Sequence, residues 1–184
     1  MNLTVLVLLA ALAAPAAHAV EYRTVLPAQS SIHFEFRQMG VPVKGGFKRF
    51  AAEMAFDPAK PEAARAKIEI DLASIDAGSS EADEESAGRL WFNRSAYPKA
   101  TFVSSQVRAL GDNRYEMRGT LTLKGKTREM TMPVTYTPGK NAATFDGGFL
   151  LKRLDFGIGE GLWADVATVA NEVQVRFRIA ASGN

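Results

Sequence analysis

Few side chains in this sequence have the chemistry to act on a substrate. The chain has no cysteine, and of its two histidines His18 lies in an apolar leader, so that only His33 remains in the rest. This excludes thiol nucleophiles, thiolate zinc sites, attached c-type haem and any metal site built on two or more histidines. His33 falls on the polar side of an alternating pattern, which predicts a surface histidine. No catalytic residue, metal ligand or cofactor is predicted.

Carboxylates are the remaining candidates for acid–base chemistry. The segment LDFGIGEGLWAD contains Asp155, Glu160 and Asp165, but no pattern brings two of them together as a catalytic dyad, and a flexible connection is favoured. Its glycines have the spacing G-x-G-x-G with no helix pattern after them, so a loop is predicted rather than a phosphate site. The run SEADEE lacks the ordered spacing of a calcium loop, and a solvated helix face is expected.

Composition indicates one globular domain. The 184 residues are 47% apolar and 23% charged, with a net charge of +2, and we place the domain at residues 20–184. Basic residues occur in small clusters, which argues against a nucleic-acid partner. One cluster, Lys44, Lys48 and Arg49, either meets an anionic head group or forms an exposed strand edge, and the second alternative is favoured.

The first nineteen residues, MNLTVLVLLAALAAPAAHA, are typical of a secretory signal peptide. They form an apolar run that ends in the small-x-small pattern Ala17, His18, Ala19, so cleavage after Ala19 is expected. The alternative, a structural helix, is disfavoured because the run is short for a membrane span of ~20 residues and a globular sequence follows at once. We therefore predict a periplasmic protein that begins at Val20.

From Glu21 onward the hydrophobic pattern mostly has a period of two. In SIHFEFR, Ile32, Phe34 and Phe36 alternate with polar residues, which indicates a half-buried strand. The same pattern or a strand-like composition appears in FKRFAAEMAF, KIEIDLASI, ATFVSSQV, YEMRGTLTL, EMTMPVTY, TFDGGFLL and NEVQVRFRI. Turn signals separate these runs. Together they predict about eight antiparallel strands in one all-β domain.

Strands of this kind form a sandwich or close into a barrel, and closure removes exposed edges. An outer-membrane barrel has strands of ~9–11 residues with the apolar face outward, whereas several runs here are shorter and their polar face is densely charged. A soluble barrel with an apolar interior is favoured. An interior of about eight strands is either filled by side chains or holds one small ligand.

The stretch LWFNRSAYPKATFVSSQV raises the question of a ligand, because it places four aromatic residues close together after an acidic segment. The acidic segment is predicted to be a short helix, with Ser80 and Asp83 at capping-box spacing. We expect the helix to end at Leu90, Trp91 and Phe92, which form the apolar underside of a cap over the barrel. The alternative is a cap that seals a filled core.

Several motifs together resemble the YceI-like family of exported, lipocalin-like polyisoprenoid-binding proteins. They are S-x-I-x-F-x-F, G-G-F-K-R-F, FNRSAYPKATF, GTLTLKGKTREMTMPV and D-F-G-I-G, and the resemblance covers essentially the whole mature chain. It implies an elongated barrel of about eight strands, a helical segment near its mouth, and an apolar channel for an isoprenoid tail. This chain has SSEADEESAGRL where many relatives have histidine and arginine, and Gln38, Met39 and Gly40 where they often have a histidine. Head-group contacts of relatives are therefore not carried over.

The resulting hypothesis is a non-enzymatic periplasmic binder or carrier of a polyisoprenoid, isoprenoid quinone or similar amphiphilic lipid. Transient contact with a membrane or a quinone-using membrane protein is kept open, and the oligomeric state is not predicted. The alternatives are an enzyme acting on such a lipid and a structural or stress-response protein with a filled core. The predicted ligand-binding residues are Ile32, Phe34, Phe36, Ile68, Ile70, Leu90, Trp91, Phe92, Phe102, Met117, Leu121, Met132, Phe149, Val175 and Phe177.

Overall fold

The computed structural model describes residues 20–183, and within them one eleven-stranded sheet dominates. The predicted signal peptide, residues 1–19, lies outside the described residues. All strand pairs are antiparallel, and the order across the sheet is β4-β5-β7-β8-β9-β10-β11-β2-β3-β6, with β1 paired to β11. The strands are β1 (Tyr22–Val25), β2 (Ser31–Gln38), β3 (Val41–Phe47), β4 (Phe50–Ala55), β5 (Arg65–Asp71), β6 (Ile75–Asp76), β7 (Lys99–Gly111), β8 (Arg114–Leu123), β9 (Lys126–Thr137), β10 (Ala143–Lys152) and β11 (Glu172–Gly183).

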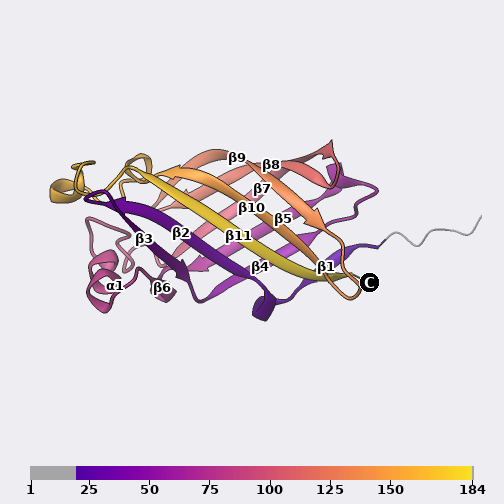
Figure 1. Ribbon diagram of the computed structural model, residues 1–184, viewed down its shortest axis with the longest axis horizontal. Helices are drawn as coiled ribbons and strands as arrows, with labels where there is room; N and C mark the ends of the chain where they lie inside the picture. Colours follow the sequence, from indigo (N-terminus) through magenta and orange to yellow (C-terminus); the bar gives the residue numbers. More distant parts are fainter. Residues whose placement is uncertain (1–19, 184) are drawn as a thin grey trace, which may run out of the picture.

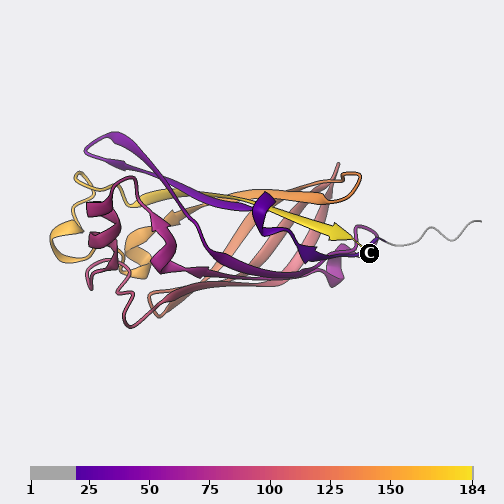
Figure 2. The ribbon, with the colours of Figure 1, turned by 90° about the horizontal axis from the view of Figure 1, so that it is seen from below.

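The sheet curls on itself into an elongated barrel (Figures 1 and 2), and within residues 20–183 no strand ladder joins its edge strands β4 and β6. Two residues, Lys48 and Arg49, lead from β3 near one edge directly into β4 at the other. At the opposite end of the barrel, β1 pairs with β11 and also reaches Phe56, the residue after β4. The Tyr22 backbone donates to the Phe56 carbonyl at 2.8 Å, and the Phe56 backbone donates to the Tyr22 carbonyl at 3.1 Å. The predicted all-β antiparallel barrel is confirmed.

All eight predicted strand regions contain strands, but the prediction missed β1, β3 and β6. FKRFAAEMAF is not one strand, since β3 ends at Phe47 and β4 begins at Phe50. VPVKGGF was not predicted because proline and paired glycines are typical of turns. It forms β3 through its register with β2, in which Phe34 pairs with Gly45.

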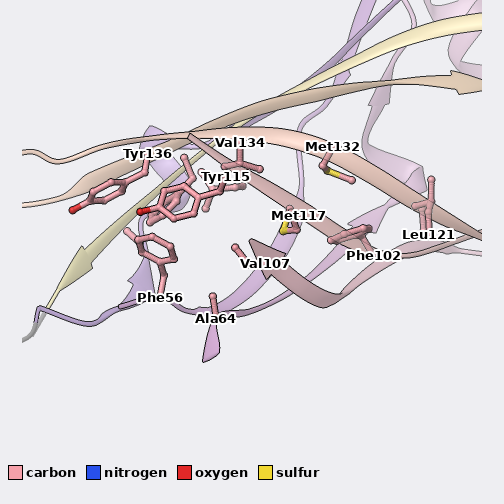
Figure 3. Close-up of a cluster of buried hydrophobic side chains, with 14 of the residues drawn as sticks. Phe56, Ala64, Phe102, Val107, Tyr115, Met117, Leu121, Met132, Val134 and Tyr136 are labelled. Carbon is pink, nitrogen blue, oxygen red and sulfur yellow. The ribbon is translucent and has the colours of Figure 1, made fainter. Parts of the chain in front are cut away.

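Aromatic side chains fill one end of the barrel, which we call the aromatic end. Its members are Tyr22, Phe56, Tyr115, Tyr136 and Phe145, all buried. Phe56 lies edge-on to Tyr115 and Phe145, with ring centroids 5.2 and 5.0 Å apart, and Figure 3 shows Phe56 among the tyrosines. The Tyr22 and Tyr136 hydroxyls share a hydrogen bond of 3.0 Å. Burial and this bond raise the pKa of Tyr136 well above its usual range, so its hydroxyl is neutral.

The opposite end, the loop end, carries helix α1 (Ser80–Ala87), the turns after β2 and β8, and the long connection from β10 to β11 (Figure 1). The capping prediction was wrong by one residue. Ser79 is the N-cap, and its hydroxyl accepts from the Ala82 backbone at 3.2 Å. Asp83 instead accepts from the Ala77 backbone at 2.6 Å, because the chain enters the helix from β6 at this point.

Helix α1 also ends earlier than predicted. It stops at Ala87, before Gly88, and residues 90–92 lie in turns. The Leu90 carbonyl accepts from the Gly159 and Glu160 backbones at 2.7 and 2.9 Å, so the β10–β11 connection takes the carbonyl that a longer helix would use. Among residues 20–183 no helix is long and apolar enough to cross a membrane.

Candidate ligand-binding interior

A cavity of about 60 Å³ lies inside the barrel, between β4 and β5 on one side and the inward faces of β8 to β11 on the other. Its lining is almost wholly apolar. Three small residues, Ala52, Ala64 and Ala66, leave the space, because each side chain ends at its β-carbon. Figure 3 shows Ala64, Val107, Met117 and Tyr115 around this region. The remaining lining residues are Glu53, Met54, Ala55, Phe56, Arg65, Ile68, Val134, Phe145, Phe177 and Ile179.

The cavity is smaller than the ~150 Å³ cavity that takes up benzene in an engineered protein. A long tail therefore fits only if lining side chains move. Met54 and Met117 are suited to this, since an unbranched thioether has three rotatable bonds and adapts to irregular spaces. Further along the barrel, inward-facing aromatic and aliphatic side chains of β2, β5, β10 and β11 are only partly buried. Part of the apolar inner face is thus accessible beyond the cavity.

Two glycines shape the inner face by letting phenylalanine rings lie flat against the sheet. Phe177 pairs with Gly147, and Phe34 pairs with Gly45. A β-carbon on either glycine would overlap the ring of its partner. The rings therefore cover the neighbouring strand instead of standing across the barrel, which keeps the interior open.

The predicted ligand-binding residues occupy three settings. Buried inward-facing positions hold Ile32, Phe102, Met117, Leu121 and Met132. Partly buried positions on the same face hold Phe34, Phe36, Ile68, Ile70, Phe149, Val175 and Phe177. At the loop end, Trp91 and Phe92 pack against the core, whereas Leu90 is 40% exposed, so its predicted place under the cap was wrong. Of the whole set, Ile68, Met117 and Phe177 border the cavity.

Sequence reasoning missed most of the cavity lining. Tyr115, Val134, Phe145 and Ile179 followed the alternating pattern and were recognisable as inward-facing. The alanines gave no signal, because alanine is common on both faces of a strand and only the packing shows where small size leaves space.

Arg153 organises the loop end and was also missed. Its side chain is 2% exposed and donates to the carbonyls of Ala170, Ile158, Gly159, Trp163 and Val169 at 2.6–3.0 Å. These five bonds use the donors of the guanidinium fully. Burial lowers the pKa of Arg153.

Two tryptophans pack beside this arginine. The guanidinium carbon of Arg153 lies 5.8 Å from the Trp91 ring centroid, a cation–π distance. The Trp91 and Trp163 rings are 5.5 Å apart, and the Trp163 indole donates to Glu85 of α1 at 2.9 Å. Within residues 20–183, the Trp91 indole nitrogen is the buried side-chain donor that lacks a partner. The connection from β10 to β11 is thereby held against both α1 and the barrel.

An ion pair closes the same connection on the side of the β8–β9 turn. Lys124 Nζ lies 3.1 Å from Glu160 Oε2 and also donates to the Gly157 carbonyl. The hydrogen bond and positive charge of Lys124 lower the pKa of Glu160. Asp165 has local partners instead, the Ala167 backbone at 2.9 Å and the Thr168 hydroxyl at 3.0 Å.

Charged groups elsewhere lie on the outer wall. Lys48 and Arg49 pair with Asp76 and Asp71 at 3.0 and 2.8 Å. Lys44 lines a second pocket of about 170 Å³ with His33, Phe34, Glu35, Gly45, Gln174 and Arg176. His33 is exposed, as predicted. In the part of the chain that the structure describes, no cluster of three metal-ligating side chains occurs.

Comparison with known proteins gives consistent matches over nearly the whole described chain. The family model of the YceI-like domain matches residues 24–181. A UPF0312 protein of Azotobacter vinelandii is 32% identical over 138 residues, which cover 71% of this chain and 72% of that protein. The crystal structure of BcnA from Burkholderia cenocepacia is 42% identical with a TM-score of 0.84, covering 86% of this chain and 99% of that one.

A more distant solved structure has the same fold. It is a polyisoprenoid binding domain from Saccharophagus degradans, implicated in plant cell wall breakdown, with 17% identity and a TM-score of 0.66. The alignment covers 91% of this chain and 100% of that domain.

Proposed function

Because this chain belongs to the YceI-like domain family, we propose that it binds and carries a long-chain apolar lipid of the polyisoprenoid class, without chemical conversion, inside the barrel. The observation that carries the proposal is the apolar cavity bordered by Ile68, Met117 and Phe177, which continues into partly buried inward-facing side chains. The fold shared with a domain described as polyisoprenoid-binding supports the class of ligand.

Tail length dominates the expected affinity. Burying roughly twenty carbons at ~0.8 kcal/mol each gives ~16 kcal/mol gross, against association costs of ~4–15 kcal/mol. The side chains that now fill the space must be displaced as well, so a short fatty acid is held weakly. Isoprenoid quinones and polyprenyl lipids meet the requirement of length, largely irrespective of head group.

Organic extraction of protein purified without detergent, followed by mass spectrometry, tests the proposal. We expect a long-chain isoprenoid in the extract and, in competition assays, affinity that rises with chain length. An empty extract together with binding that ignores chain length would overturn the proposal.

A structural protein with a filled core is the second candidate, and the small volume of the cavity, about 60 Å³, favours it. An empty extract with high thermal stability would support this candidate. An enzyme acting on the lipid would instead show a modified lipid after incubation.

We also propose that the mature protein is periplasmic and begins at Val20. The apolar leader that ends at Ala17, His18 and Ala19 supports this. Amino-terminal sequencing of protein from a periplasmic extract is expected to start at Val20. Recovery of an intact Met1 from the cytosol would show that the leader is not removed.

A further inference from the structure

Four exposed apolar side chains lie on two loops of the loop end. They are Met39, Val41, Leu162 and Val166, exposed by 73, 62, 89 and 55% respectively, and we call them the apolar tip. Two come from the β2–β3 turn and two from the β10–β11 connection. The Met39 backbone donates to the Thr168 carbonyl at 2.9 Å, and the Ala170 backbone donates to the Arg37 carbonyl at 2.9 Å. The two loops that carry the apolar tip are therefore joined by backbone hydrogen bonds.

Met39 occupies a backbone position that does not suit it. Gln38 pairs with Val41, so Met39 and Gly40 form a two-residue turn with φ of 48° and 80°. Positive φ at both positions favours Asn-Gly or Asp-Gly. The β7–β8 turn at the aromatic end follows this preference with Asp112 and Asn113, at φ of 53° and 58°. Methionine at such a position weakens the turn, so the fold does not account for it.

Among residues 20–183, Lys124 is the other residue with positive φ that is not glycine, asparagine or aspartate, and its side chain makes contacts that explain it. It has φ of 48° at the first position of the β8–β9 turn, and its amine bonds Gly157 and Glu160. The Met39 side chain is 73% exposed instead.

Leu162 and Val166 are held outward by a rigid loop. Arg153 binds the carbonyls of Gly159, Trp163 and Val169 from within. The backbone that carries these apolar side chains is thus ordered before any partner arrives, which reduces the ordering cost of insertion.

We infer that the apolar tip inserts into the surface of a phospholipid bilayer. This inference rests on the proposed function, because a lipid carrier must exchange its ligand with a membrane. Figures 1 and 2 show the β2–β3 turn and the β10–β11 connection projecting at one end of the elongated barrel, away from the described chain ends. Protruding side chains suit insertion between head groups, whereas a stable protein partner requires a face of ~800 Å², well beyond four aliphatic side chains.

Charges around the tip indicate that insertion, rather than electrostatics, drives the contact. Arg37 lies at its base and donates to the Gly40 carbonyl at 2.8 Å, a place from which a guanidinium reaches lipid phosphates. Acidic α1, with Glu81, Asp83, Glu84 and Glu85, lies at the same end and opposes an anionic surface. Binding is therefore expected on neutral and anionic bilayers alike, and at high salt.

Vesicle flotation tests the inference with two kinds of vesicle. One contains phosphatidylcholine alone, and the other contains phosphatidylethanolamine mixed with phosphatidylglycerol. The full mature protein is expected to float with both. Met39→Asn and Leu162→Ser should each weaken partitioning ~tenfold, since each removes the transfer of one large apolar side chain. Met39→Asn is informative because asparagine suits the turn and should preserve or raise the thermal midpoint. Leu110→Ser, 44% exposed on β7 near the aromatic end, is the matched control and should float like the parent.

Three outcomes would overturn the inference: no flotation of the parent, an equal loss in Leu110→Ser, or release by high salt. The alternative partner of the apolar tip is a second copy of the chain, and light scattering without vesicles detects it. A dimer that is lost in Leu162→Ser would assign the apolar tip to self-association. The lipid extract is measured separately. A protein that retains lipid but does not float contradicts only the inference that the apolar tip inserts into a bilayer. A protein that floats but yields an empty extract contradicts the proposed function.

Discussion

At the scale of single residues, Arg153 has the largest structural role outside the barrel interior. A buried guanidinium without a carboxylate is costly to desolvate, and here five backbone carbonyls provide the compensation. The residue therefore binds together the backbone of a glycine-rich segment whose Phe156 and Ile158 side chains are buried beside it.

Replacing Arg153 by methionine should be strongly destabilising. Its volume is partly kept, but five buried carbonyls lose their donor, and we expect a loss of ~3–5 kcal/mol in the free energy of unfolding. Lys152→Met, at the exposed preceding residue, should change it by no more than ~0.5 kcal/mol. Urea denaturation of the two variants measures the difference, and equal losses would show that the five bonds contribute little.

At the scale of elements, the β10–β11 connection is a rigid cap rather than the flexible link that its glycines suggest. Three contacts hold it: Arg153 from within, the Trp163 bond to Glu85 of α1, and the Lys124–Glu160 ion pair. The Arg153 bonds involve no acidic side chain, whereas the Lys124–Glu160 pair depends on an ionised carboxylate. Acid should therefore loosen one side of the cap first.

The Lys124–Glu160 ion pair should make the local stability of the β10–β11 connection depend on pH. The pKa of Glu160 is lowered from 4.5 in the fold, so its stabilisation is complete above about pH 4.5 and is lost as the pH falls through the lowered folded value. The protection factors of the amides at residues 157–163, which are exchange rates corrected for the intrinsic effect of pH, should fall below pH 4.5 in the parent. Glu160→Gln should exchange rapidly at neutral pH too, while Asp155→Asn, an exposed carboxylate of the same segment, should behave like the parent. Parallel acid responses in all three would exclude Glu160 as the cause.

At the scale of the whole molecule, the barrel is closed at both ends and accessible between them. The aromatic end is sealed by Phe56 and its neighbours, and the loop end by Phe156 and Ile158, which are 2 and 4% exposed. The cavity lies between these plugs, beside β4. A ligand tail that enters the cavity must therefore lie next to the aromatic end, where Ala52, Ala64 and Met117 line the wall.

Adjacent alanines of β4 test this placement. Ala52 lines the cavity and Ala51 faces solvent. Ala52→Leu adds three carbons to the space and should weaken isoprenoid retention ~50-fold, because losing three tail carbons from the contact costs ~2.4 kcal/mol at ~0.8 kcal/mol each. The larger side chain should cost no more than ~1–3 kcal/mol of stability. Ala51→Leu should leave retention unchanged. The measurement is the amount of bound lipid per mole of protein. Equal retention in the parent, Ala52→Leu and Ala51→Leu would place the ligand elsewhere.

The sequence alone determined the strand content and the facing of most strands, because a one-residue change of register would move a whole apolar set into water. Ile32 on β2, Met117 on β8 and Ile179 on β11 all lie on the predicted face. The motifs also indicated the family. Local patterns were less reliable where several conformations suit the same residues, as at Ser79 and in VPVKGGF.

Only the tertiary structure decided where the interior is empty and what holds the loop end. The cavity exists because Ala52, Ala64 and Ala66 meet across two neighbouring segments, and a missing volume depends on all of its walls at once. Arg153 reads in sequence as an ordinary surface cation, since its five acceptors are backbone groups whose positions no side-chain pattern records. The alternation of apolar and polar residues involves neighbours along the chain and can be recognised in the sequence. Packing and hydrogen-bond satisfaction instead require residues that are distant along the chain to be placed together.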